Sequence, residues 1–510
     1  MYPVTPPTPR RGSDGRDAHD DVTHAAHHDP TDAHDAHPPP ILAAADQPKR
    51  LRSKNRFAPT APETWQYDLS PKPRGFWKIS RENSSHKRVR RACPDGTLTR
   101  SQPPHTRRPR SWLRTAPLLL ALLLGAPAQT AWAEPAKQSF TAFVESLWPQ
   151  ASANGISRKS FDQAAAGLTS DPEVLGLTRR QPEYAKPLGA YMGPMVTSAR
   201  IAQGSRLATT WTATLTGIDK TFGVDPFIVL AIWGIETSYG NVPSTKDVFR
   251  SLATLAYARY RDDFFRDEYL AALTIIENKH IPREKMLGSW AGAMGQAQFI
   301  PSSYLKYAVD FSNDGRADIW TNVPDVLGSI ANYLAKSGWE RGLPWGFEVL
   351  IPKDFDYRKS RGTFAQWRAL GLSRADHGTL PTQGDAVLLF PSGGDGPAFL
   401  VTGNYLAIKA YNNSDAYALA VANLADRMHG GGPIVTPWPA DDHPLPRTDR
   451  MALQHALAKL GYKVNNFQGQ VDFDLRDSIR DIQVKAGWRP DGNPTDALLK
   501  HVLSLAAGRH

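Results

Sequence analysis

The chain has 510 residues, 41% of them hydrophobic and 22% charged, which is long enough for about two to four domains with a buried core. Its formal net charge of +10 is concentrated in residues 1–133, which carry +9, whereas the remainder carries +1. A near-neutral body excludes nucleic acid as a partner. The single cysteine, Cys93, excludes a disulfide within the chain.

Residues 1–105 have the composition of a disordered extension. Their run HDDVTHAAHHDPTDAHDAHPPP has no hydrophobic period and few large apolar side chains. Residues 106–133 then read as a secretory signal peptide, with an arginine-rich start, a short apolar run and an Ala-Trp-Ala cleavage site before Glu134. A signal peptide so far into a chain indicates that the start codon is assigned too early.

The predicted signal peptide also sets the expected location. Its apolar run, 116–126, is too short to span a bilayer, and no second run follows, so no transmembrane segment is expected after cleavage. Cysteine is absent directly after the run, whereas a bacterial lipoprotein requires one there. We therefore expect a soluble periplasmic protein, and a monomer.

Residues 134–432 show mainly helical periodicity, and Asp225-Pro226 is a typical helix start. Strand-like stretches are few, near 346–352 and 385–391, and they predict a β element the size of a hairpin. The predicted helices are 139–151, 250–277, 327–339 and 416–428.

The C-terminal part is predicted to be a separate unit. Residues 433–447 are rich in proline and aperiodic, which is typical of a linker. Residues 448–510 contain three helical segments with apolar positions at helical spacing. These positions include Leu453, Leu457, Leu460, Leu475, Ile479 and Ile482.

The segment FIVLAIWGIETSYG, residues 227–240, ends a buried run on a carboxylic acid, Glu236. Burying a charge is costly unless the charge is paired or neutralised. Glu236 is therefore either a paired structural residue or an acid whose pKa is raised by the apolar wall of Ile232, Trp233 and Ile235. Patterns for nucleotide, dinucleotide and zinc sites are missing from the sequence, so we expect carboxylate chemistry without a required cofactor.

Two further segments carry candidate ligands. GSWAGAMGQAQFIPSSY, residues 288–304, combines small residues, amides and aromatic rings, which suits a carbohydrate cleft, although a closely packed helix has the same composition. DFSNDGRADIW, residues 310–320, matches several positions of a calcium loop but has Thr321 where the bidentate glutamate belongs, and Asp325 could supply a later carboxylate. A turn without metal is the alternative.

Taken together, these segments resemble the membrane-bound lytic transglycosylase B family of peptidoglycan-cleaving enzymes. The carriers are GIETSYG, LATLAYARYRDDFF, GSWAGAMGQAQFIPSSY, DVLGSIANYLAKSGW and YNNSDAYALAV, in the family order. The resemblance implies a mainly α, lysozyme-like fold with Glu236 as the catalytic acid. The C-terminal segments are similar to peptidoglycan-binding domain 1, a three-helix wall anchor.

The resemblance also implies further site residues, and peptidoglycan glycan strands as the partner. A structural calcium is implied at Asp310, Ser312, Asp314 and Asp325, although one extra residue precedes Asp325. The implied substrate contacts are Arg261, Ser289, Gln298, Tyr333, Tyr411, Asn412 and Tyr417.

The expected reaction is cleavage of the β-1,4 bond between N-acetylmuramic acid and N-acetylglucosamine. An ordinary glutamic acid has a pKa of about 4.3, so the acid must be kept protonated by its surroundings. A hydrolase needs a second carboxylate, for which only Asp262 and Asp263 are candidates. One carboxylate suffices if the sugar's own 6-hydroxyl attacks, which forms a 1,6-anhydro end. A muramidase and a non-catalytic wall-binding protein are the alternatives.

Overall fold

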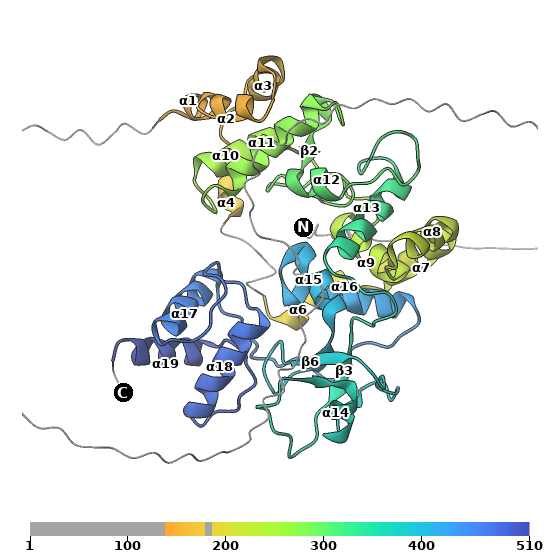
Figure 1. The fold of residues 1–510 in the computed structure, drawn as a ribbon, viewed down its shortest axis with the longest axis vertical. Helices are drawn as coiled ribbons and strands as arrows, with labels where there is room; N and C mark the ends of the chain where they lie inside the picture. The colour runs from red at the N-terminus through yellow and green to blue at the C-terminus, as the bar shows by residue number, and fades with distance from the viewer. Residues whose placement is uncertain (1–137, 179–185, 509–510) are drawn as a thin grey trace, which may run out of the picture. The chain divides into compact units, whose positions relative to one another are not determined.

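The computed structural model describes residues 138–178 and 186–508. The expected extension, 1–105, and the expected signal peptide, 106–133, lie outside these residues. The described chain is mostly helical, as predicted, with a smaller β-sheet among the helices (Figure 1). Within this part, none of the helices has the length and apolarity needed to cross a membrane.

Short helices form the first part of the described chain. The single helix predicted over 139–151 is wrong, because the chain breaks at Ser146 and Leu147 and a second helix starts at Trp148. Pro149 lies in the first turn of that second helix, where a missing N–H is tolerated. The helices are α1 (Phe140–Glu145), α2 (Trp148–Ala153), α3 (Arg158–Ala165), α4 (Pro172–Leu177), α6 (Leu188–Met195), α7 (Ser198–Thr210) and α8 (Thr212–Phe222).

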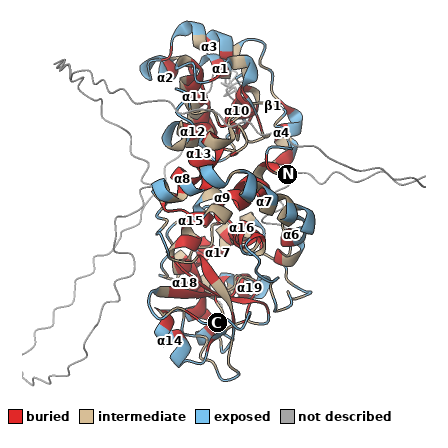
Figure 2. Ribbon diagram, turned by 90° about the vertical axis from the view of Figure 1, so that its right-hand side faces the viewer, coloured by how far each residue is buried: buried red, intermediate tan, exposed pale blue. Residues whose placement is uncertain are grey.

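The predicted apolar run forms α9 (Pro226–Thr237), the helix around which the main core is built. It packs against α7, α13 (Val323–Lys336) and α16 (Asp415–Met428). It is buried from Ile228 to Ile235, as expected for a helix that is apolar on all sides (Figure 2). The other helices of this core are α10 (Val248–Tyr257), α11 (Phe264–Glu277), α12 (Pro301–Tyr307), α13 (Val323–Lys336), α15 (Gly403–Asn412) and α16 (Asp415–Met428), with a short 3₁₀ turn at Arg283–Lys285.

The continuous helix predicted over 250–277 is also wrong. α10 ends at Tyr257, and α11 begins at Phe264. Between them Arg259 and Arg261 adopt left-handed backbone angles, with φ of 52° and 58°. α10 and α11 pack against each other, so the chain must turn between them, and this tertiary demand overrides the local helical pattern.

The β element is larger than the predicted hairpin. Both predicted strands form, as β3 (Gly346–Leu350) and β6 (Asp385–Leu389). They do not pair with each other, because β7 (Ala398–Val401) lies between them and is antiparallel to both. The sheet order is β4-β6-β7-β3-β5, with β4 (Arg361–Thr363) and β5 (Ser373–Arg374) at its edges.

Helix α14 (Phe364–Ala369) contacts β4 and lies beside this sheet (Figure 1). Its Trp367 is buried in a small core with Leu388 and Leu400 of the sheet. A separate two-stranded sheet pairs β1 (Lys246–Asp247) with β2 (Leu287–Gly288).

The C-terminal unit has the three predicted helices, α17 (Arg447–Lys459), α18 (Phe473–Lys485) and α19 (Asp496–Ala506). The predicted apolar positions form its core, with Leu460 partly buried and Leu498 contributed by the third helix.

Candidate active site

Glu236 lies in the last turn of α9, at the end of the buried run. The helix begins where Asp225 accepts a backbone N–H of the first turn at 2.8 Å, and it ends where Ser238 becomes left-handed with φ of 50°. Gly234 is required near this end, because a Cβ there would lie 2.6 Å from the ring of Tyr239, which folds back on the helix. The helix therefore stops one residue after Glu236. Glu236 itself is partly exposed and lies at the edge of the core.

Tyr417 contacts the predicted acid directly. Its hydroxyl donates a hydrogen bond to Glu236 Oε1 at 2.6 Å, across 181 positions of sequence. Tyr417 lies in the first turn of α16 and is 1% exposed. Burial, followed by the negative charge of Glu236, raises the pKa of the Tyr417 hydroxyl well above its ordinary value. Tyr417 therefore remains a hydrogen-bond donor to Glu236 at neutral pH.

Tyr411 and Tyr333 extend this contact into a group of three tyrosines. The ring of Tyr411 is parallel to that of Tyr417, with an interplanar angle of 10° and centroids 6.2 Å apart, and Tyr333 lies 4.7 Å from Tyr411. Tyr411 donates to the carbonyl of Ala297 at 2.6 Å, and Tyr333 donates to that of Ala410 at 2.7 Å. Because both hydroxyls are bound to backbone, the two rings are held in fixed orientations.

Gln296 ties α9 to the loop that faces it. Its Oε1 accepts from Trp233 Nε1 and its Nε2 donates to the carbonyl of Trp320, both at 2.9 Å, while Thr237 donates to its backbone carbonyl at 3.0 Å. A Cβ on Gly240 would come within 2.3 Å of Gln296 Oε1, which explains the glycine at that position. Gln296 is one of the amides that suggest a carbohydrate cleft in residues 288–304, but it is not among the substrate contacts that the resemblance implies.

The segment 288–300 is an irregular loop, not the closely packed helix considered as its alternative. Gln298 has a left-handed φ of 51°, and its Nε2 donates to Ser244 Oγ at 3.0 Å and to the carbonyl of Gly295 at 2.8 Å. Ser289 Oγ accepts two backbone N–H groups of the same loop, at 3.3 and 3.1 Å. Both predicted contact residues therefore stabilise the loop that Gln296 and Tyr411 attach to α9 and α15.

Two other predicted contacts lie outside the tyrosine group. Arg261 is exposed, and its guanidinium lies over the ring of Tyr260, 5.5 Å from the centroid. Asn412 is exposed at the end of α15. Within the described chain, neither residue shares a hydrogen bond or ring contact with Tyr417.

The acids considered as a second carboxylate are on the surface. Asp262 and Asp263 are exposed in the turn before α11, and Asp263 pairs with Arg266 at 2.9 Å.

Known protein families match both the part of the chain that holds the candidate site and the C-terminal unit. The model of the transglycosylase SLT domain matches residues 139–426, which contain Glu236 and all three tyrosines. The chain belongs to this family. A putative peptidoglycan binding domain matches residues 446–502, the three-helix unit. The mainly α, lysozyme-like fold and the C-terminal helical domain expected from the sequence are confirmed.

Solved and curated relatives agree with this assignment. Two crystal structures of SltB3 from Pseudomonas aeruginosa, in complex with NAG-anhNAM-pentapeptide and with NAG-NAM-pentapeptide, match at 44% identity and a TM-score of 0.64, covering 72% of this chain and 100% of theirs. Membrane-bound lytic murein transglycosylase B of Escherichia coli (strain K12) is 35% identical over 217 residues. That match covers 41% of this chain and 58% of the curated relative.

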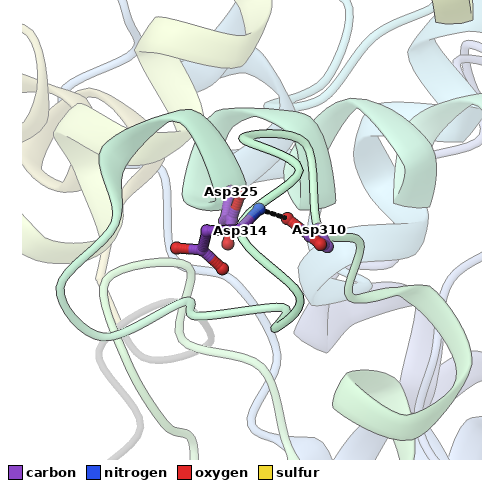
Figure 3. Close-up of side chains that lie close together, drawn as sticks. All are labelled: Asp310, Asp314 and Asp325. Atoms are coloured by element: carbon purple, nitrogen blue, oxygen red, sulfur yellow. Dashed lines mark hydrogen bonds between the residues drawn. The ribbon is translucent and has the colours of Figure 1, made fainter.

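The SLT domain also contains the predicted calcium loop. Carboxylate oxygens of Asp310, Asp314 and Asp325 lie within 4.8 Å of one another (Figure 3). The loop is closed by the backbone N–H of Asp314, which donates to Asp310 Oδ1 at 3.0 Å, and Gly315 has a φ of 96°. Ser312 Oγ contacts Asp310 Oδ1 at 3.4 Å. Two of these carboxylates belong to the loop, and Asp325 lies in the first turn of α13. Carboxylate oxygens are the donors that calcium prefers.

Asp325 also binds the backbone of this loop. It is 0% exposed; its Oδ1 accepts the N–H groups of Phe311 and Ser312 at 2.9 and 2.8 Å, and its Oδ2 accepts that of Asp318 at 2.9 Å. Asp325 therefore holds both ends of the loop through backbone hydrogen bonds.

A cavity of about 870 Å³ lies at the opposite end of α9 from Glu236. It is lined by Phe227, Trp345 and Asp426, among others, and by none of the predicted site residues. Burial raises the pKa of Asp426 to about 6, although the Trp345 indole donates to this carboxylate and opposes the rise. We place the candidate site at Glu236, because neither Glu236 nor any of the three tyrosines lines this cavity.

Proposed function

We propose that this chain is a lytic transglycosylase that cleaves the β-1,4 bond between N-acetylmuramic acid and N-acetylglucosamine in peptidoglycan and leaves 1,6-anhydromuramic ends. The observation that carries the proposal is the pairing of Glu236 with the Tyr417 hydroxyl at 2.6 Å inside the SLT domain. The SltB3 structures support the substrate class, since they are complexes with NAG-NAM-pentapeptide and NAG-anhNAM-pentapeptide.

In this mechanism Glu236 is the single acid and base. Because Tyr417 donates to Oε1, the transferable proton is carried by Oε2. That proton passes to the glycosidic oxygen as the bond to the anomeric carbon breaks. The resulting carboxylate takes the proton of the muramic 6-hydroxyl, whose oxygen bonds to the same anomeric carbon. The proton returns to Glu236, and no water is consumed.

Tyr417 stabilises the intermediate state of this cycle. Its O–H is a donor before and after proton transfer, and a hydrogen bond to a carboxylate is stronger than one to a neutral carboxyl group. The bond also fixes the direction of the Glu236 side chain, which favours the geometry of transfer. Tyr333 and Tyr411, with their hydroxyls bound to backbone, would offer ring faces to sugars. The loop is stabilised by Gln298 and Ser289, which would act on the substrate through it. Direct contact of the substrate with Arg261 and Asn412 stays a prediction.

The reaction type is tested by digesting purified peptidoglycan with the chain from residue 134 and reading the released ends by mass spectrometry. We expect anhydromuramic ends. Reducing ends would instead identify a muramidase. Retention on the wall without release would identify a binding protein.

The Tyr417 contact gives a second expectation. Tyr417→Phe removes only the hydroxyl, and a hydrogen bond to a charged group contributes about 1.5–3 kcal/mol, so kcat should fall about 10- to 100-fold. Initial rates of muropeptide release measure this. Tyr257→Phe is the matched control, because its hydroxyl binds the carbonyl of Gln138 in the exposed N-terminal region. A Tyr417→Phe enzyme with the wild-type kcat would show that the contact has no catalytic role.

We also propose that the loop of Asp310, Ser312, Asp314 and Asp325 binds a structural calcium ion. A calcium complex is named for a solved lytic transglycosylase of Escherichia coli, whose TM-score of 0.48 is too low to transfer the ion. The proposal is supported instead by the three carboxylates that converge in this loop. The ion would neutralise their repulsion and would have no part in the proton transfers.

Calcium should therefore raise the melting temperature. At about 100 times its Kd, a ligand that binds only the folded state adds about 2.7 kcal/mol to the free energy of unfolding. Thermal melts with calcium and with chelator measure the shift, which Asp314→Ala should abolish. Asp354→Ala, an exposed acid outside the loop, should retain it. Equal melting of the wild type in both buffers would remove calcium from the account.

The C-terminal domain and the N-terminal signal complete the proposal. The match to a peptidoglycan binding domain supports a role in holding the enzyme on the wall. Peptidoglycan as substrate and the predicted signal peptide together support action in the periplasm.

A further inference from the structure

Asp415, the first residue of α16, lies two positions before Tyr417 and joins an ion cluster that spans two domains. Its Oδ1 accepts from Lys409 Nζ and from the Tyr405 hydroxyl, both at 2.7 Å. Its Oδ2 accepts from Arg476 Nη2 at 3.0 Å. Lys409 and Tyr405 belong to α15 of the SLT domain, whereas Arg476 belongs to α18 of the peptidoglycan-binding domain.

This cluster is buried at the contact between the domains. The side chain of Arg476 is 4% exposed and that of Asp415 is 13% exposed. Burial acts to raise the pKa of Asp415, but the charges of Lys409 and Arg476 outweigh it and hold that pKa well below its ordinary value. Asp415 is therefore charged, and it depends on both cations, because a buried charge that loses a partner is strongly destabilised.

The rest of the contact shows that the wall-binding domain is docked on the SLT domain. Arg361 of β4 pairs with Asp477 at 2.7 Å and with Asp474 at 3.2 Å, both on α18. Arg480 Nη2, from the same helix, donates to the carbonyl of Leu388 in β6 at 3.1 Å. Of these contacts between the domains, only the one from Arg476 to Asp415 reaches α16, the helix that carries Tyr417.

The side-chain cap of the first turn of α16 is weak. Its cap, Ser414 Oγ, accepts the N–H of Tyr417 at 3.4 Å, which is a long hydrogen bond. The negative charge of Asp415 at the first helical position stabilises the start of α16. When the Asp415 carboxylate is held in place, the turn that carries it is held as well. Arg476 holds it from the neighbouring domain.

We propose that Arg476 is a positioning residue for the transglycosylase reaction: by fixing Asp415, the docked wall-binding domain sets the first turn of α16 and thereby the Tyr417 hydroxyl on Glu236. The inference rests on the proposed function. It gives the C-terminal domain a part in turnover in addition to retention on the wall, through the sequence of contacts Arg476, Asp415, Tyr417 and Glu236.

The test compares Arg476→Met with Arg361→Met in the chain from residue 134. Both variants remove an arginine from the same domain contact, but only the first touches α16. We expect Arg476→Met to lower kcat about 10-fold or more, because small displacements of catalytic groups have large effects on rate. KM and sedimentation with purified sacculi should stay at wild-type values. Arg361→Met should keep kcat within about twofold of the wild type.

A conservative variant separates positioning from folding. Arg476→Lys keeps the positive charge beside Asp415, so kcat should recover to within about threefold of the wild type. The recovery should be incomplete, because lysine lacks the fork that binds Asp415 and the carbonyl of Gly492 together. If Arg476→Met does not fold, as judged by near-ultraviolet circular dichroism, the comparison of Arg476→Gln with Arg361→Gln decides, and only the former should lose activity, because glutamine removes the charge but keeps a polar side chain.

Equal kcat values for the Arg476 and Arg361 variants, whether both normal or both reduced, would overturn the inference while leaving the proposed function intact. A wild-type chain that releases no muropeptides would contradict the proposed function itself, and this inference with it.

Discussion

Glu236→Gln should release anhydromuropeptides about 10³- to 10⁴-fold more slowly than the wild type, because general acid–base catalysis contributes up to about this factor and one residue performs both proton transfers. Glutamine keeps the shape of the side chain and an oxygen that can accept from Tyr417, so the fold should persist. Initial rates on purified peptidoglycan, with melting temperature measured in parallel, give the comparison.

The matched control is Glu340→Gln, which makes the same exchange at an exposed position outside the site. It should have wild-type rates. Binding to sacculi should be unchanged in both variants, since the C-terminal domain is untouched. A Glu236→Gln enzyme within about tenfold of the wild type would exclude Glu236 as the acid, because such a residual rate is too high for a site without its proton donor.

Asp325→Ala should have the largest effect on stability. Asp325 is 0% exposed and accepts three backbone N–H groups in partly buried hydrogen bonds, which the variant would remove while leaving a buried gap. Each unsatisfied buried group costs about 1–3 kcal/mol, so the loss should be about 3 kcal/mol or more. For a domain of this size, that lowers the melting temperature by about 6 °C or more.

Measuring this effect in chelator separates structure from metal binding. Asp314→Ala, at an exposed position in the same loop, should lower the melting temperature much less when calcium is removed, because it breaks only surface hydrogen bonds. If Asp325→Ala and Asp314→Ala melt alike in chelator, Asp325 acts only as a ligand, and the proposed structural role of its backbone contacts is wrong.

Local signals in the sequence predicted the element that positions the acid. Asp225-Pro226 begins α9, an apolar run fills it, and the residues after Glu236 end it in a left-handed turn. These features act within a few residues of each other, so they are readable without the fold. The three C-terminal helices follow the same rule, since each carries its own apolar stripe.

Features that depend on distant contacts were not predictable in this way. The break between α10 and α11 interrupts a sequence with helical character on both sides, and it follows from the packing of one helix on the other. β7 is a run of four buried apolar residues, too short to distinguish a strand from a helix by its period, and its place between β3 and β6 is set by the sheet. The contact of Tyr417 with Glu236 joins residues far apart in the chain, and no spacing rule reveals it.

The candidate site shows the same division. The resemblance implied roles for Glu236, Tyr411 and Tyr417, and the structure brings these three together. It implied roles for Gln298 and Ser289 too, yet their side chains bind their own loop and, for Gln298, also Ser244. A motif records which residues occur together, whereas the atom that each side chain contacts is set by the tertiary fold.

In the proposed mechanism one carboxylate suffices, because the substrate's own hydroxyl replaces water. Digestion of purified peptidoglycan in water labelled with heavy oxygen, followed by mass spectrometry of the newly formed ends, tests this mechanism. We expect anhydromuramic ends that contain no heavy oxygen, formed by the wild type and lost in Glu236→Gln. Heavy oxygen at the anomeric carbon of the new ends, present from the earliest time points, would contradict it, because water would then be the attacking group and a second catalytic carboxylate would be required.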